Sequence, residues 1–328
     1  MLTTTATPTE TLPGLKALLR ETALRALGSR LRVLYRVRKL GRGNWRIVLN
    51  LHRVGLADGS SYAPLRPALF DELLVFLTRE FQLTTFEAGE EAARKPLAIL
   101  SFDDGYKDFI EVAAPMLRRH RVRCNHNVIP ECIETQRPPL NVLVQDFIGM
   151  APARIVQQLD IPGFRVDAGP ALGLRLSAFI KNKPSREQRE LADLLLPQLY
   201  AWEGFRPTPM MTLEEVRQIA GEHELGAHSY SHASMACETD EYLQQDVRKC
   251  QDYFREKLGT PVTIYAFPNG SYAPGQLELV EGAGIRHVLL TGEDFDRGAT
   301  RHARFTFHAG TSSEVRFRAT GGLRPIPE

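Results

Sequence analysis

Short apolar runs of strand character alternate with helical segments along most of this chain. Alternation of this kind predicts a parallel β-sheet or a barrel with helices packed around it. Thr212 followed by Glu215 predicts a capping box at the start of one helix. The predicted strands are 46–51, 97–102, 123–129, 224–228, 262–267, 286–291 and 303–308, and the predicted helices between them are 68–80, 108–119, 213–222, 240–257 and 275–282.

Residues 130–211 interrupt this rhythm. They contain segments such as MAPARIVQQL and REQRELADLLLPQLY, which have the pattern of helices and their connections rather than of strands. We therefore expect one domain at 44–328 with a helical insertion at 130–211. Insertions at the carboxyl ends of the strands shape the substrate site in such folds, so we expect this one to border the cleft.

The segment before the domain, residues 1–43, has a different composition. Residues 1–14 are rich in Thr and Pro and are predicted to be disordered. Residues 15–39 carry leucines at helical spacing and many arginines, which predicts a basic amphipathic helix. We favour a helix packed on the domain with its basic face in solvent, and attachment to an anionic membrane surface is the alternative. The predicted apolar face comprises Leu15, Leu18, Leu19 and Ala23, continued by Leu27, Leu31 and Leu34.

The bulk composition excludes some classes of function. The chain has 328 residues, 43% of them hydrophobic, so it can bury a sizeable core. Its 41 Lys and Arg nearly balance its 39 Asp and Glu, so nothing in the charge calls for a nucleic acid partner. Four scattered cysteines, no secretory signal and no spanning segment predict a cytoplasmic protein, with membrane association through 15–39 as the variant.

Two adjacent carboxylates, Asp103 and Asp104, follow the apolar run LAILSF. Catalytic groups of α/β folds lie at the carboxyl ends of strands, and Gly105 allows the sharp turn that lets both side chains face one pocket. The alternative is that one aspartate caps the next helix and the other is solvated. A metal ion would relieve the repulsion between them, since one carboxylate could bind it while the other acts as a base.

The stretch ELGAHSYSHASM places His228 and His232 four residues apart, again after a predicted strand. At this spacing two imidazoles can share a metal ion, although such pairs also occur as ordinary core or surface histidines. Together with a carboxylate from another strand end they predict a site with two histidines and one carboxylate, which leaves positions open for water and substrate.

Two further strand ends carry polar residues. Pro268 and Asn269 follow the run at 262–267 and form either an ordinary turn or a backbone N–H donor for an oxyanion. His52 follows the run at 46–51. A lone histidine is more often structural, but its position at a fourth strand end, in a pattern with the Asp and His residues of the others, makes it a candidate. For His126 and His308 we favour structural roles.

The motifs FDDG, HSYSH and FPNGSY, in this order, resemble the polysaccharide deacetylases of carbohydrate esterase family 4, the nodulation-type deacetylase domain. LHRV ahead of them resembles the YHRV segment of many bacterial members, including those that act on poly-N-acetylglucosamine. The resemblance covers about residues 46–320 and matches poorly at 130–211. It implies a distorted, incomplete (β/α) barrel of about seven strands and hydrolytic removal of N-acetyl groups from an amino sugar or polysaccharide.

The resemblance also implies roles for single residues. Asp103 would be the general base and His52 the general acid. Pro268 and Asn269 would present the oxyanion-binding N–H. Asp104, His228 and His232 would hold a divalent metal ion, with Zn²⁺ as the first choice.

The chain departs from the family pattern at the third motif. Typical members have Arg-x-Pro-Tyr where this chain has Ala266, Phe267, Pro268 and Asn269, so the arginine that orients the base is missing. Arg304, before the last strand, is the candidate substitute. In typical members the histidine that acts as the general acid lies near the C-terminus, so His308 is the alternative to His52 in this role.

Three other functions remain open at this point. One is deacylation or deformylation of a nucleotide- or lipid-linked sugar. The second is a catalytically inactive relative that binds carbohydrate, although a binding protein needs no base beside a metal. The third is a scaffold at a membrane surface, attached through residues 15–43. The sequence leaves the sugar, the physiological metal and the oligomeric state open.

Overall fold

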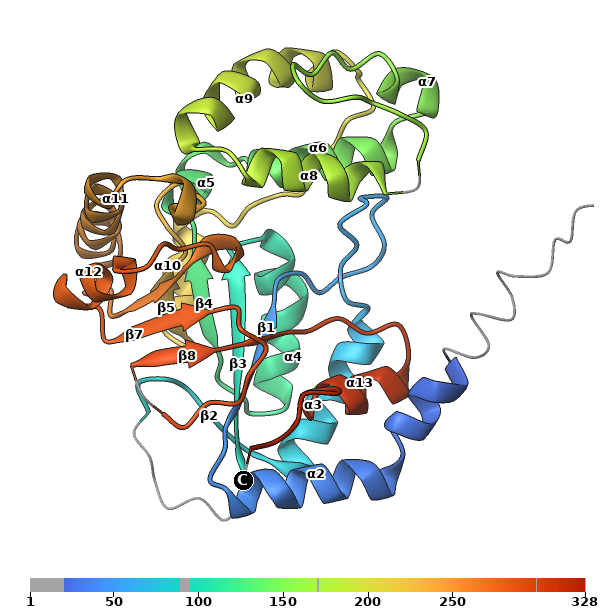
Figure 1. Cartoon of the computed structure of the whole chain (residues 1–328), viewed down its shortest axis with the longest axis vertical. Coiled ribbons are helices and arrows are strands. Elements are labelled where there is room, and N and C mark those ends of the chain that lie inside the picture. Colours follow the sequence, from blue (N-terminus) through green and yellow to red (C-terminus); the bar gives the residue numbers. More distant parts are fainter. Residues whose placement is uncertain (1–20, 89–94, 170, 299, 328) are drawn as a thin grey trace, which may run out of the picture.

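The computed structural model describes residues 21–88, 95–169, 171–298 and 300–327 (Figure 1). Over these residues nine strands, all paired in parallel, form one sheet in the order β8-β7-β6-β5-β4-β3-β1-β9, with β2 paired to the start of β3. The strands are β1 (Ile47–Leu51), β2 (Gln82–Thr84), β3 (Leu97–Asp104), β4 (Asn125–Val128), β5 (Glu224–Ala227), β6 (Ile264–Ala266), β7 (His287–Leu290), β8 (Arg301–Ala303) and β9 (Phe305–Thr306).

The sheet curls into a nearly closed barrel. Its two edge strands, β8 and β9, are consecutive in the chain and are separated by Arg304 alone, so the two edges lie next to each other. This confirms the expected distorted (β/α) barrel. The run predicted as one strand at 303–308 is instead divided between β8 and β9, because the chain passes from one edge of the sheet to the other at Arg304.

Helices cover the outside of the sheet (Figure 1). The predicted capping box is present: the Thr212 hydroxyl accepts from the Glu215 N–H, and the Glu215 carboxylate accepts from the Thr212 N–H. The helix predicted at 108–119 begins with a π-helical turn, Phe109–Ala113. The helices are α2 (Arg30–Arg42), α3 (Pro67–Glu80), α4 (Ala114–Arg119), α5 (Pro130–Thr135), α6 (Leu140–Met150), α7 (Ala153–Val156), α8 (Leu172–Lys181), α9 (Ser185–Tyr200), α10 (Leu213–Ala220), α11 (Asp240–Tyr253), α12 (Gln276–Gly282) and α13 (Ser312–Arg318), with short 3-10 or π turns at Met235–Cys237, Phe254–Leu258 and Pro268–Gly270.

Alternation along the strands divides their side chains between two faces. In β3, Ala98, Leu100 and Phe102 pack in the large core under the helices. Ile99 packs instead in a small cluster with Val48 of β1 and other inward-facing residues of the sheet. By the same alternation, Ser101 and Asp103 of β3 face the inside of the barrel. Asn50 of β1 and His52 after it face the same way, so these polar side chains meet inside the barrel.

The segment between β4 and β5 forms a helical excursion, α5–α9, above the carboxyl ends of the strands (Figure 1). It has its own core, in which Phe147, Leu176 and Leu195 are fully buried. The buried carboxylate of Asp146 fastens the excursion to its surroundings, because it accepts hydrogen bonds from Ser60 Oγ and from the N–H and hydroxyl of Thr208.

The N-terminal helix differs from its predicted form. Residues 1–20, including the predicted tail and Leu15, Leu18 and Leu19, lie outside the described residues. Residues 21–27 are helical, the helix breaks at Gly28 and Ser29, and α2 begins at Arg30. A Cβ on Gly28 would lie 2.3 Å from the Ser313 carbonyl oxygen, so the chain turns against α13 at this point.

The break at Gly28 changes which side of the helix faces the core. The predicted apolar face is wrong at Ala23, which is exposed, and at Leu31, which is 84% exposed. The buried positions of α2 are Val33, Arg36, Val37 and Leu40. Within the described part of the chain, no helix combines the length and the apolar composition needed to cross a bilayer.

Candidate metal centre and active site

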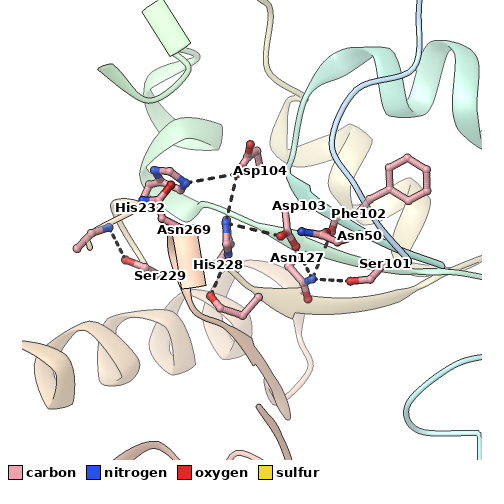
Figure 2. Close-up of polar contacts among 12 residues, drawn as sticks. Asn50, Ser101, Phe102, Asp103, Asp104, Asn127, His228, Ser229, His232 and Asn269 are labelled. Atoms are coloured by element: carbon pink, nitrogen blue, oxygen red, sulfur yellow. Dashed lines mark hydrogen bonds and ion pairs between the residues drawn. The ribbon is translucent and has the colours of Figure 1, made fainter. Parts of the chain in front are cut away.

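Three potential metal ligands meet above the carboxyl ends of β3 and β5 (Figure 2). The Asp104 carboxylate lies 3.4 Å from His228 Nε2 and 3.6 Å from His232 Nε2, both measured from Oδ1. One ligand atom from each residue lies within 4.8 Å of the other two, and all three residues are buried. The structure thus brings together the three residues predicted as a metal triad.

The donor set fits a divalent ion. One carboxylate oxygen and two imidazole nitrogens are ligands that zinc accepts, with further positions left open. Asp104 Oδ1 is buried and has no hydrogen-bond partner, an arrangement that costs free energy unless a cation compensates it. His228 Nδ1 donates to the Ala266 carbonyl oxygen at 2.9 Å, which leaves Nε2 as the free lone pair directed at Asp104.

The backbone around these ligands is left-handed at several non-glycine residues. Asp104, Ser229, His232 and Asn269 have φ values of 80°, 58°, 63° and 59°. Such conformations cost of order 1 kcal/mol or more each and persist where the surrounding structure holds them. These four residues lie at the carboxyl ends of β3, β5 and β6, at the same edge as the potential metal ligands.

A buried carboxylate holds the loop that carries both histidines. Asp246 of α11 accepts from Ser229 Oγ at 2.8 Å, from the Tyr230 N–H at 3.0 Å and from the Tyr265 hydroxyl at 2.8 Å. Burial raises the pKa of Asp246 to about 6, and these three donors oppose the rise. Asp246 therefore holds the loop between His228 and His232 through hydrogen bonds to Ser229 and Tyr230, without contacting the potential metal ligands.

Asp103 lies beside the triad in a different environment. Its Oδ1 accepts from Arg304 Nη1 at 2.8 Å and from Asn127 Nδ2 at 2.8 Å, and its Oδ2 lies 3.8 Å from His228 Nε2. Burial alone would raise the pKa of Asp103, but Arg304 and His228 lower it well below its usual range. Asp103 is thus an oriented, ionised carboxylate next to the metal ligands.

Arg304 occupies the barrel interior and is fully buried. The same Nη1 also donates to Asn50 Oδ1 at 3.1 Å and to Ser101 Oγ at 3.0 Å. Arg304, which lies between β8 and β9, therefore contacts Asp103 from the point where the barrel closes.

His52 follows β1 on its inward face, and its imidazole lies near both aspartates. Burial lowers its pKa, while the charges of Asp104 and Asp103 raise it by less. Arg53 holds the following loop: its guanidinium donates to Asp108, to Asp58 and to the Tyr62 carbonyl. The LHRV motif therefore supplies a side chain to the site together with the ion pairs that fix its backbone.

The remaining predicted residues lie at different distances from this centre. Asn269 lies above β6 beside His232 (Figure 2), and its side chain donates to Ser234 Oγ at 3.1 Å. Pro268 is buried next to it. His308 is exposed beyond β9, and His126 is buried on the outward face of β4 against Phe102 and Phe109.

A pocket of about 430 Å³ borders the centre on the side of the excursion. His232 and Ser231 form one end of it, and residues of α5, α6 and α9 form its walls. Its lining mixes apolar side chains such as Leu140 and Leu196 with charged ones of both signs, Arg137, Arg189, Glu131 and Asp193.

Lys181, at the end of α8, also reaches toward the centre. Among the described residues its ammonium has no hydrogen bond or ion pair, and its charge acts on Asp104 and His232. Burial lowers the pKa of Lys181, and Asp104 opposes this.

Sequence reasoning missed Asn50, Ser101 and Asn127, which complete the surroundings of Asp103 and Arg304. A signal was present: each is a polar residue on the inward side of an otherwise apolar or fully buried strand, and the register pairs Asn50 with Ser101 and Asp103 with Asn127. Gly226 belongs to the same arrangement, because a Cβ there would lie 2.2 Å from Asn127 Oδ1. The sequence does not predict that Lys181 lies near the site, because nothing in its segment shows where α8 ends relative to the barrel.

Comparison with known protein families gives a match over part of the chain. Residues 181–288 match the family model described as polysaccharide deacetylase, a range that includes His228, His232 and Asn269 but not Asp103 and Asp104. No curated protein matches the chain in sequence.

Among solved structures, the chain is similar to the Streptococcus pyogenes deacetylase PplD in complex with acetate, with a TM-score of 0.56 and 16% identity over 84% of this chain and 98% of that one. It is also similar to IcaB from Ammonifex degensii, with a TM-score of 0.55 and 17% identity over 84% and 97% of the two chains. A de-N-acetylase from Aggregatibacter actinomycetemcomitans gives 0.51 and 13% over 82% and 98%. At these identities the likeness shows the shared fold.

Proposed function

We propose that this chain is a metal-dependent hydrolase that removes N-acetyl groups from an amino sugar or polysaccharide, as the match of residues 181–288 to the polysaccharide deacetylase model suggests. The family match and the fold support deacetylase activity. One observation carries the proposed metal dependence and mechanism: the two adjacent aspartates have different surroundings. Asp104 lies next to the imidazoles of His228 and His232, and Asp103 is paired with Arg304.

Asp104, His228 and His232 would hold the ion, most simply Zn²⁺. When bound, a divalent ion supplies Lewis acidity, which polarises an acetyl carbonyl and favours deprotonation of water. No other carboxylate or imidazole among the described residues joins this group of ligands.

Asp103 would act as the general base. It takes a proton from the attacking water while the water oxygen forms a bond to the acetyl carbon. Arg304 and Asn127 hold its Oδ1, so Oδ2 is the oxygen that faces His228 and the metal ligands. The lowered pKa makes Asp103 a weak base in the absence of substrate, and it gains its role from position beside the reacting water.

His52 would act as the general acid. It gives its proton to the amide nitrogen as the carbon–nitrogen bond breaks, and the products are acetate and a free amine. The lowered pKa makes its imidazolium a stronger acid, at the cost of a smaller protonated fraction. The backbone N–H of Asn269, after Pro268, would donate to the oxyanion that develops on the acetyl oxygen.

The excursion would select the substrate. The pocket beside His232 is large enough for a further part of the substrate, and its mixed lining suits a sugar with polar substituents better than a purely apolar group. We propose that 130–211 acts as an insertion in one domain at 44–328, with the segment before it outside the catalytic unit.

Release of acetate from N-acetylglucosamine oligomers by the metal-loaded full chain tests the proposal. We expect turnover that stops after chelation and returns when Zn²⁺ is added. Asp103→Asn is the matched control, because it keeps the size of the side chain and leaves the triad in place while removing the base; thermal melting shows whether the variant is folded. Turnover that survives both chelation and Asp103→Asn would overturn the mechanism, and metal binding without any turnover on a panel of N-acyl and N-formyl sugars would favour an inactive carbohydrate-binding relative.

A further inference from the structure

Helix α2 carries an excess of unpaired positive charge. Residues 30–42, RLRVLYRVRKLGR, contain no Asp or Glu. Arg36 and Lys39 are used inside the protein, where they donate to the carbonyl oxygens of Thr320, Arg324 and Ile326. Within the described residues the other arginines of α2 have no hydrogen bond or ion pair: Arg30, Arg32, Arg38 and Arg42.

Two large apolar side chains stand among these arginines. Leu31 is 84% exposed and Tyr35 is 66% exposed. Leu31, Tyr35, Arg38 and Arg42 follow one another at intervals of four, three and four residues, so they form one line along the helix, the α2 stripe. The stripe therefore places two exposed apolar side chains in line with two arginines that have no ion pair among the described residues.

A groove of about 490 Å³ continues the basic surface at the start of α2. Four arginines line it, Arg25, Arg30, Arg79 and Arg316. Its one acidic lining residue, Glu80, is bonded to Arg79 at 2.7 Å, and Arg25 is paired with Glu21 at 2.6 Å. Among the described residues, Arg30 and Arg316 are therefore the lining arginines without an ion pair. The groove therefore keeps a net positive charge next to the stripe.

The stripe and the groove lie far from the candidate active site. Helix α2 lies at the bottom of Figure 1, on the side where the strands begin, and the strands β3 and β4 point away from it toward the excursion. A partner bound to α2 would leave the carboxyl ends of the strands and the pocket beside His232 open.

We infer that the α2 stripe and its groove bind the surface of an anionic lipid bilayer, with the barrel mouth directed away from the membrane. Arginines at the surface bind lipid phosphates, while Leu31 enters the boundary with the acyl chains and Tyr35 takes the interfacial position that suits an aromatic ring with a polar end. Exposed leucine and tyrosine favour a bilayer over a nucleic acid, whose phosphates need only the arginines. The site then acts on a substrate on the far side of the protein from the membrane.

Flotation of the full chain with vesicles tests the inference. We expect binding to vesicles of phosphatidylglycerol and phosphatidylcholine in equal parts, weaker binding at high salt, and little binding to phosphatidylcholine alone. Each arginine near an anionic surface contributes about fivefold to binding, so Arg30→Ala, Arg38→Ala and Arg42→Ala together should weaken it on the order of hundredfold. Leu31→Ser with Tyr35→Ser should weaken it on the order of tenfold or more.

Arg154→Ala with Leu174→Ser is the matched control, since both residues are exposed on the excursion and Leu174 is 65% exposed. It should bind vesicles as the unchanged chain does, and thermal melting shows whether each variant is folded. Equal binding to both kinds of vesicle, or an equal loss in the control, would overturn the inference. A nucleic acid partner would give a different pair of results. The chain would bind an RNA duplex through the three arginines, and Leu31→Ser with Tyr35→Ser would leave vesicle binding unchanged; this pair of results would also overturn the inference.

Discussion

The barrel interior and the helical excursion both carry charged side chains, but these side chains are buried and paired in the barrel and, among the described residues, exposed and unpaired in the pocket of the excursion. Inside the barrel, Asp103 and Arg304 are almost fully buried and share a network of hydrogen bonds. In the excursion, Arg137 and Arg189 line an open pocket and have no ion pair among the described residues. A buried network fixes one geometry, as a reaction requires, whereas exposed unpaired charges can adapt to a ligand. We expect chemistry to depend on the barrel and selection of the substrate to depend on the excursion.

The largest effect should follow from removing the base. Asp103→Asn should lower kcat on the order of 10²–10⁴-fold while the protein still binds its metal, because the triad is intact. Turnover and metal content measured on the same sample check this. If Asp103→Asn loses the metal and Asp104→Asn keeps it, the two aspartates have the opposite roles.

Breaking the Asp103–Arg304 pair should affect both folding and activity. Arg304→Met leaves a buried carboxylate without its cation, which costs about 3–5 kcal/mol in the free energy of unfolding. Arg46→Met is the matched control, because it breaks another buried pair, Arg46 with Asp296 at 2.7 Å, outside the candidate site. Denaturant unfolding should show a large loss for both variants, and only Arg304→Met should also lower kcat of the folded fraction. A folded Arg304→Met variant with unchanged kcat would show that this pair only supports the barrel.

Removing the acid should have a smaller effect than removing the base. His52→Ala should lower kcat on the order of a hundredfold without changing the metal content, since His52 is outside the triad. His308→Ala should be nearly silent, because His308 is exposed beyond β9. The reverse result, with His308→Ala inactive and His52→Ala active, would assign the acid to the C-terminal histidine.

Asp246, which holds the loop between His228 and His232, is expected to affect the affinity for the metal ion. Asp246→Asn removes the charge that holds Ser229 and Tyr230, and residues that orient ligands in this way typically change metal affinity about 10–100-fold. A zinc competition titration measures the effect. Unchanged affinity with reduced stability would restrict Asp246 to a role in packing.

The smallest effect should come from the excursion. Arg189→Ala should raise KM a few-fold for an N-acetylated oligosaccharide and leave turnover of a single N-acetylated sugar unchanged. Arg186→Ala, on the same helix but outside the pocket lining, is the control. Equal effects of Arg189→Ala on both substrates would contradict the division between barrel and excursion.

Much of this barrel could be predicted from the sequence because its signals are local. Apolar runs ending in Asp103 and Asp104, in His228 and in His52 show both the strand and its functional end. Alternation then decides which side chains face inward, and the same rule would have identified Asn50, Ser101 and Asn127. The position of Arg304 was suggested by its place before the last strand, but its contact with Asp103 depends on how the barrel closes.

The rest depends on packing between distant segments. The N-terminal helix breaks at Gly28, which packs closely against Ser313, and Leu31 after the break is exposed. No periodicity within 15–39 predicts this long-range contact. Lys181 reaches the centre because of how α8 packs on α6, over a segment whose sequence shows helices but not their placement.

X-ray absorption of the zinc-loaded chain shows whether Asp104, His228 and His232 bind the metal while Asp103 remains free. We expect nitrogen and oxygen ligands at about 2.0–2.2 Å, two of them imidazoles, unchanged in Asp103→Asn and altered in Asp104→Asn. A sulfur ligand at about 2.3 Å, which the nearby Cys132 in the lining of the pocket would provide, or a first shell altered by Asp103→Asn alone, would contradict it.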